Sequence, residues 1–252
     1  MDKQELELLK ILPKVNRICS FFLFGKKLDV RGLSNFPEKG PSLIVGNHAG
    51  SFKDIAVIVK IIPRTFFFTA NKSLFTKKDM NLLVNMHLNR HLKEFGPVVN
   101  MALKPVTIPL RNFLANNLPK VGTIPVDLLG SKRKAIAQSQ EYLEKGRAVI
   151  LLQGRGRVHP ENPHPYINPF RRGPAVLCYN LYKELGISVP VTTVTMFGTH
   201  KPWIEPGRVK VQVGKPLYIR DYLTDNFETT VQSFREAMET QTRRHFYELL
   251  KS

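Results

Sequence analysis

Apolar runs of strand-forming residues alternate with stretches of helical composition along most of this chain, and that alternation restricts the fold more than any other feature. The segment PSLIVGN at 41–47 predicts a buried strand bounded by Pro and Gly, and FKDIAVIVKII at 52–62 predicts the helix that follows it. The largely apolar RAVILLQ at 147–153 predicts another such strand. Strands alternating with helices are typical of the α/β class, in which helices flank a central, mixed and mostly buried sheet.

The remaining elements extend this pattern to the C-terminal region. Further strands are expected at 28–33, 65–70, 122–127, 188–198 and 208–217. Further helices are expected at 79–95, 106–119 with an interruption at Pro109, 132–146, 173–186 and 229–250. The 252 residues show no internal repeat and no clean linker, so we expect a single α/β domain over 28–252.

Residues 1–27 form a separate N-terminal segment. Apolar residues recur near helical spacing over 2–23 and predict an amphipathic helix with a kink at Pro13. The helix either packs against the core or lies on a membrane surface, and FFLFGKK at 21–27 favours the membrane, because aromatic rings followed by lysines suit a headgroup boundary. We expect neither a membrane span, because no apolar run is long enough, nor a secretory signal.

The charge balance is strongly basic, with 38 Lys and Arg against 20 Asp and Glu and a formal net charge of +18. Such an excess favours an anionic partner: nucleic acid, an acidic membrane face or a phosphorylated substrate. A nucleic-acid surface should interleave aromatic with basic residues, whereas FFLF and TFFFT are consecutive, as burial or lipid contact prefers. We therefore expect a membrane surface with anionic lipids as partner, and no nucleic acid. The two cysteines fit a reduced compartment.

A turn after the 41–47 strand carries the polar pair Asn47 and His48, with an acid at Asp54. Five residues separate His48 from Asp54, so a helix that starts near Ser51 places the carboxylate in its first turn. A carboxylate bonded to one ring nitrogen fixes the tautomer and leaves the other nitrogen as a base. The alternative is an ordinary turn in which Asp54 is only a favourable acid at a helix start.

Basic residues follow the 147–153 strand. It ends in Gln153, and the next residues are Gly154, Arg155, a glycine and Arg157. Ligands of α/β sheets usually bind at strand ends, and guanidinium groups grip phosphate in bidentate fashion. A solvated basic turn is the alternative interpretation.

Two further segments add basic residues near predicted strand ends or helix starts. NPFRRGPA places Arg171 and Arg172 before a helix, and NKSLF places Lys72 just after a strand.

These blocks, in this order, resemble the glycerolipid acyltransferase superfamily, whose best-known members acylate glycerol 3-phosphate and lysophosphatidic acid. The matching segments are SLIVGNHAGSFKD, TFFFTANKSLF, VGTIPVD, VILLQGRGRV with NPFRRGPAVL, and ISVPVTTV, and the late strand VKVQVGKPL looks like the family's ending. The resemblance covers roughly residues 28 to 220. Each block is weak alone, but five in sequence are hard to obtain by chance.

The resemblance implies an O-acyltransferase similar to 1-acylglycerol-3-phosphate O-acyltransferases, with His48 as general base and Asp54 as its partner. The acyl donor would be a thioester, acyl-CoA or acyl-ACP (acyl carrier protein), and the acceptor a hydroxyl of a glycerolipid or lysolipid. No metal, other cofactor or covalent acyl-enzyme is expected. Residues expected to bind substrate are Asn47, Lys72, Gln153, Gly154, Arg155, Arg157, Arg171 and Arg172. The expected location is peripheral, on the cytoplasmic face of a membrane.

Three departures from the family pattern bear on the acceptor. The family has four residues between His and Asp where this chain has five, Gln153 replaces the usual Glu, and Leu128 stands where the second block usually ends in Arg. We therefore expect an acceptor head group that differs from plain glycerol phosphate. A non-catalytic lipid-binding relative is the alternative function.

An apparent insertion lies near 77–105. Its predicted helix is interpreted either as a lid or membrane-facing helix or as an extra core helix. His87 and His91 have a metal-ligand spacing, but no third ligand is evident and we assign no metal site.

Overall fold

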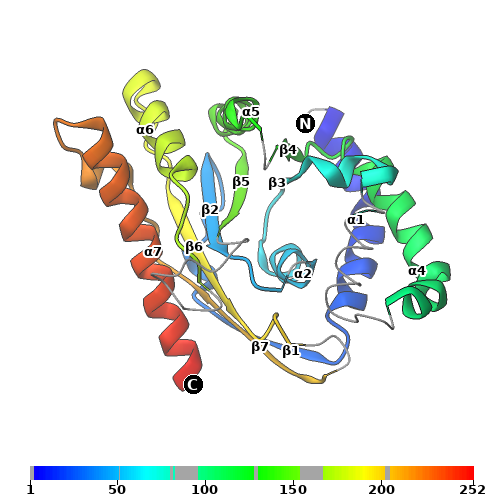
Figure 1. Ribbon diagram of the computed structural model, residues 1–252. Coiled ribbons are helices and arrows are strands. Elements are labelled where there is room, and N and C mark those ends of the chain that lie inside the picture. The colour runs from blue at the N-terminus through cyan, green and yellow to red at the C-terminus, as the bar shows by residue number, and fades with distance from the viewer. Residues whose placement is uncertain are drawn as a thin grey trace. The chain divides into compact units, whose positions relative to one another are not determined.

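The computed structural model describes residues 3–50, 52–79, 82, 96–127, 130–153, 167–201 and 205–252. The chain divides into two compact units, one made of Met1–Lys10 and Phe68–Ala135 and the other of Ile11–Phe67 and Ile136–Ser252. Both units combine strands with helices (Figure 1).

The larger unit contains a mixed five-strand arrangement in the order β1-β7-β6-β2-β5. Its strands are β1 (Lys26–Arg31), β2 (Ser42–Asn47), β5 (Ala148–Gln153), β6 (Val191–Phe197) and β7 (Gly207–Val213). Strand β2 is parallel to both β5 and β6, β6 is antiparallel to β7, and β7 is parallel to β1. The α/β class with a mixed sheet and flanking helices is therefore confirmed.

Strand β2 is the centre of the larger unit, and its burial explains its sequence. Leu43, Ile44 and Val45 are at most 1% exposed, because β5 and β6 pair with both edges and helices cover the faces. The register sets Asn47 beside Gln153, so the carboxyl ends of β2 and β5 coincide. Asn47 and Gln153, two of the polar residues predicted from sequence, thus lie side by side at the carboxyl ends of these strands.

Helices α2 (Phe52–Ile61), α6 (Gly173–Leu185) and α7 (Phe227–Lys251) belong wholly to this unit. Figure 1 shows α6 and α7 on one side of β2 and β6, with α2 on the other. Helix α7 packs on β6, β7 and α6 through an apolar stripe that includes Val231, Phe234, Met238 and Phe246. The side chain of Asn226 starts it by accepting a hydrogen bond from Thr229 N at 3.0 Å.

The smaller unit holds the parallel pair of β3 (Phe66–Asn71) and β4 (Ile124–Val126), where Thr69 pairs with Ile124 and Asn71 with Val126. The 3₁₀ helix Lys72–Phe75 follows β3 directly, and α4 (Gly96–Asn117) is the unit's long helix. Strand β3, α1 (Lys3–Phe22) and α5 (Arg133–Glu144) each continue from one unit into the other.

The N-terminal helix is confirmed, because α1 spans Lys3–Phe22 and contains Pro13. Within the described part of the chain no helix is both long and apolar enough to cross a membrane. The division at residue 27 and the membrane contact stay predictions.

Several element boundaries differ from the predictions, and two of the differences have a clear physical reason. Helix α4 starts at Gly96, ten residues before the predicted start, and continues through Pro105 and Pro109. Proline removes one helical hydrogen bond and kinks a helix without having to end it, so the predicted interruption at Pro109 is wrong. Strand β1 ends at Arg31, before Gly32 at φ 76°, a left-handed conformation that leaves the extended region.

Most of the predicted insertion, including His87 and His91, lies outside the described residues. The described part at 96–105 is the first half of α4. The lid function stays a prediction.

Both cysteines are buried and unpaired, as expected for core residues. Burial raises the pKa of Cys19 to about 11 and raises the pKa of Cys178 as well. Neither thiol is therefore a nucleophile near neutral pH.

Substituting Gly46 tests the close packing around β2. A Cβ at position 46 would collide with the carbonyl oxygen of Val194, whereas a Cβ at Gly207 meets nothing within 4 Å. We expect Gly46→Ala to lower the unfolding free energy by about 1–3 kcal/mol, as overpacked cores do. Urea denaturation measures it, with Gly207→Ala as the matched control, expected within about 0.5 kcal/mol of wild type. Equal stabilities would show that the backbone of β6 yields to the new methyl group.

Candidate active site

The site begins with Asn47, the last residue of β2. Its side chain is 1% exposed, and its amide bonds both backbone groups of Met196 in β6, with Nδ2 to O and N to Oδ1 each at 2.8 Å. The amide thereby acts as one more rung of the sheet and fixes the direction in which the chain leaves β2. These contacts give Asn47 a positioning function, and its predicted contact with substrate stays a prediction.

His48 comes next, and it contacts Asp54 despite the longer turn. His48 Nδ1 lies 2.8 Å from Asp54 Oδ2, and the carboxylate is 0% exposed. Gly50 N donates to the same oxygen at 2.7 Å. Asp54 lies in the first turn of α2, where the helix dipole favours a negative charge. The contact predicted from sequence is confirmed, and the extra residue is accommodated within the turn.

Gly50 makes that turn compact. A Cβ at position 50 would collide with the side chain of Thr199 and come within 2.6 Å of its carbonyl oxygen. The turn after β2 and the segment after β6 therefore approach each other at a point where only hydrogen fits. This close approach is why the sequence needs glycine here.

The hydrogen-bond pattern assigns the ring nitrogens. An ionised carboxylate only accepts hydrogen bonds, so Nδ1 of neutral His48 carries the proton and Nε2 holds the lone pair. The His48 side chain is 13% exposed, and the described residues supply no hydrogen-bond partner for Nε2. The arrangement orients one ring nitrogen and leaves the other able to accept a proton.

A cluster of basic side chains near Asp54 was not found by sequence reasoning. Lys53 Nζ donates to the carbonyl of Lys201, and burial, with Lys26 second, lowers the pKa of Lys53. Burial also lowers the pKa of His200, helped by Lys201 and Lys53, while Asp54 opposes that shift. Residues 200 and 201 follow β6, so only the strand order could have placed them beside the turn after β2.

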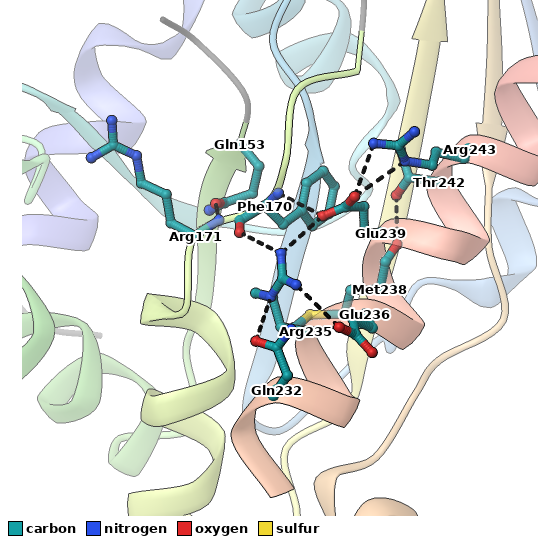
Figure 2. A network of polar contacts seen from close by, with 10 residues as sticks. All are labelled: Gln153, Phe170, Arg171, Gln232, Arg235, Glu236, Met238, Glu239, Thr242 and Arg243. Atoms are coloured by element: carbon teal, nitrogen blue, oxygen red, sulfur yellow. Dashed lines mark hydrogen bonds and ion pairs between the residues drawn. The ribbon is translucent and has the colours of Figure 1, made fainter. Parts of the chain in front are cut away.

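Gln153 at the end of β5 binds backbone on both sides. Its Nε2 donates to Leu151 O at 3.1 Å, and its Oε1 accepts from Arg171 N at 3.0 Å (Figure 2). The amide oxygen can accept this N–H as a carboxylate would, so Gln153 supplies the acceptor that a Glu at this position would supply. Gln153 is 6% exposed, and its role as a substrate contact stays a prediction.

The adjacent residues Arg171 and Arg172 differ in whether their guanidinium groups have a described partner. Arg172 pairs with Glu228 of α7 at 2.5 Å. The guanidinium of Arg171 is exposed and has no hydrogen bond or ion pair with any described residue, and Figure 2 shows it directed away from α7. Of the two guanidinium groups, that of Arg172 is paired with a described side chain and that of Arg171 is not.

The other predicted substrate residues are placed only in part. Lys72 lies in the smaller unit, where its Nζ is 2.7 Å from Asp127 Oδ2, and this hydrogen bond and the charge of Asp127 raise the pKa of Lys72. Gly154, Arg155 and Arg157 lie outside the described residues. Over the described ranges, no group of three or more His, Cys, Asp or Glu side chains is arranged to hold a metal.

Replacing Asp54 by Asn tests the assigned tautomer. We expect ¹⁵N NMR of the wild-type protein to show neutral His48 protonated at Nδ1, because the carboxylate holds that proton. In Asp54→Asn the carboxamide can donate as well as accept, so the form protonated at Nε2 should gain population. The ring of His245 on α7 serves as the internal control and should not change. A wild-type ring already protonated at Nε2 would contradict the assignment.

The comparison with solved structures agrees with this architecture. Family models and curated protein sequences give no match to this chain. Among solved structures, the 1-acyl-sn-glycerophosphate (LPA) acyltransferase PlsC from Thermotoga maritima matches with a TM-score of 0.60, covering 98% of this chain and 83% of that chain. The two sequences are 18% identical, so the likeness is one of fold. The chain thus shares its fold with this acyltransferase structure, in agreement with the fold that the order of its sequence blocks predicts.

Proposed function

We propose that this protein is an O-acyltransferase that moves a fatty acyl group from an acyl thioester to a hydroxyl of a glycerolipid or lysophospholipid. The observation that carries the proposal is the 2.8 Å contact between His48 Nδ1 and the fully buried Asp54, at the strand ends of an acyltransferase fold. The acidic partner orients the ring, and Nε2 is left to accept a proton.

The proposed reaction uses His48 first as base and then as acid. Nε2 takes the proton of the acceptor hydroxyl while the hydroxyl oxygen attacks the thioester carbonyl. The tetrahedral intermediate collapses, the carbon–sulfur bond breaks, and the imidazolium gives its proton to the sulfur, which leaves as a thiol. Asp54 stabilises that imidazolium without itself taking the proton. The products are an ester and free CoA or acyl carrier protein.

Arg171 is the proposed contact for an acceptor phosphate. Its guanidinium is exposed and unpaired within the described part of the chain, and a planar guanidinium binds phosphate in bidentate geometry. Arg172 would contribute after separating from Glu228, and Lys72, Gly154, Arg155 and Arg157 remain predicted contributors. The substitutions at Gln153 and Leu128 support an acceptor other than plain glycerol phosphate.

The second candidate is a non-catalytic lipid-binding relative, which the longer turn and Gln153 would permit. The preserved contact between His48 and Asp54 favours the enzyme, because lipid binding alone does not require an oriented imidazole.

Replacing His48 by Ala distinguishes the two candidates. We expect wild-type protein to acylate at least one member of a lysolipid panel from radiolabelled acyl-CoA or acyl-ACP, and His48→Ala to lose about 10²–10⁴ in kcat, as expected for loss of a general base. Circular dichroism and the thermal midpoint should stay near wild type. Turnover in neither protein would favour the binding relative. Equal turnover in both would exclude His48 as the base.

The expected partner surface is an anionic membrane. Phe21, Phe24 and Phe52 are 45%, 74% and 40% exposed, and Phe22 stacks on Phe52 at 5.7 Å. Each basic residue near an anionic surface adds about 1 kcal/mol of attraction, and partly inserted rings add apolar burial. Peripheral attachment to the cytoplasmic face follows, because anionic lipids concentrate in that leaflet.

Vesicle flotation tests this attachment. The protein should float with vesicles containing phosphatidylserine at low salt and detach as salt rises, because screening weakens the attraction. Phe24→Ser should weaken flotation, whereas Leu185→Ser on α6, an exposed apolar control at 51%, should not. Equal loss in both variants would mean that Phe24 has no special contact with the bilayer.

A further inference from the structure

Side chains of α7 bind the backbone of Phe170. Phe170 N donates to Glu239 Oε2 at 2.8 Å, and Phe170 O accepts from Arg235 Nη1 at 3.2 Å (Figure 2). The residue is 3% exposed, so neither backbone group has ready access to water. Buried backbone groups need partners, and at Phe170 two charged side chains of a distant helix supply both.

Glu239 is the centre of this arrangement. Its Oε2 also accepts from Arg235 Nη1 at 3.1 Å, and its Oε1 accepts from Arg243 Nε at 3.2 Å and Nη2 at 2.9 Å. The side chains of Arg235 and Glu239 are only 16% and 15% exposed. Spacing of four residues puts the three side chains on one face of α7, and on that face Arg235 and Glu239 contact the segment with Phe170. We call Arg235 and Glu239 the Phe170 clamp.

The clamp lies next to the exposed residue Arg171. Arg171 follows Phe170 directly, and its own N–H donates to Gln153 Oε1 at the end of β5. Two consecutive residues are therefore held from two directions, one by α7 and one by β5. The backbone that carries the Arg171 side chain is fixed, while its guanidinium remains exposed and unpaired within the described ranges.

We infer that Glu239, with Arg235, is a positioning residue for acyl transfer: it holds Phe170 so that the Arg171 guanidinium meets the anionic phosphate of the acyl acceptor. The inference rests on the proposed function and adds to it a specific route from α7 to acceptor binding. Bidentate contact between guanidinium and phosphate is directional, so an error of about 1 Å in the backbone of Arg171 weakens it strongly.

A purely structural role for Glu239 makes different predictions. It would lower stability or total activity without acting selectively on the acceptor. Positioning raises the KM of a phosphate-bearing acceptor, leaves the KM of the acyl donor unchanged, and acts only while Arg171 is present.

The first experiment compares Glu239→Gln with Glu248→Gln. Glu248 forms an i,i+4 contact with Arg244 at 3.9 Å on the same helix, but both side chains are well exposed, which makes it a matched control. We expect Glu239→Gln to raise the acceptor KM about tenfold, with kcat within about twofold and an unchanged pH profile. Glu248→Gln should match wild type. Arg235→Lys, which keeps the charge but loses the fork geometry, gives a second variant should Glu239→Gln fold poorly.

A double-mutant cycle tests the route. Arg171→Ala alone should raise the acceptor KM, and adding Glu239→Gln to it should cause no further rise. Additive effects, or equal changes for acceptors with and without phosphate, would overturn the inference while leaving the acyltransferase proposal in place.

Hydrogen exchange measured by mass spectrometry tests the clamp independently of turnover. Peptides that cover 168–172 should exchange faster in Glu239→Gln and unchanged in Glu248→Gln. Unchanged exchange in Glu239→Gln would overturn the clamp itself. Wild-type protein without turnover on any acceptor would overturn the proposed function, and the positioning role with it, whatever exchange shows.

Discussion

The parallel pairing of β2 with both β5 and β6 is the constraint on which the site depends. In parallel strands the carboxyl ends lie at the same end of the sheet, so Asn47, Gln153 and the residues after Phe197 come together there. The side-chain amide of Asn47 adds two hydrogen bonds there, one to the backbone oxygen and one from the backbone nitrogen of Met196. His48 is the first residue after β2, so the anchored carboxyl end of the strand sets its orientation.

The sequence predicted the local features of the site better than its long-range ones. The strand, the turn and Asp54 in the first helical turn could be predicted because they lie within a few residues of one another. The contacts of Gln153 with Arg171 and of Lys53 with Lys201 could not, since they depend on strand order and on how a loop returns. Spacing also could not show that Gly50 packs against Thr199, although that approach is what makes the longer turn compact.

Helix boundaries show the same limit. Two internal prolines conceal the early start of α4 in the sequence. The function of Glu239 was hidden for another reason. An Arg-x₃-Glu-x₃-Arg series resembles any solvated helix face, and only the fold shows that Phe170 lies against it.

The basic side chains described above divide into groups with a structural partner and groups without one among the described residues. Arg172 is paired with Glu228, Lys72 with Asp127, and Lys53 donates to a backbone carbonyl. The high net charge therefore overstates the number of cations ready for a ligand. Arg171 stands out because its backbone is anchored while its guanidinium has no such commitment among the described residues.

Gly50 serves two neighbours at once, since its amide hydrogen bonds Asp54 and its missing side chain admits Thr199. A side chain at position 50 would therefore disturb both contacts. A larger residue would drive the two loops apart and pull the carboxylate off the imidazole in the same movement. Variants of this protein that keep the six-residue step from histidine to aspartate should then also keep the glycine two residues after the histidine, whatever else changes around it.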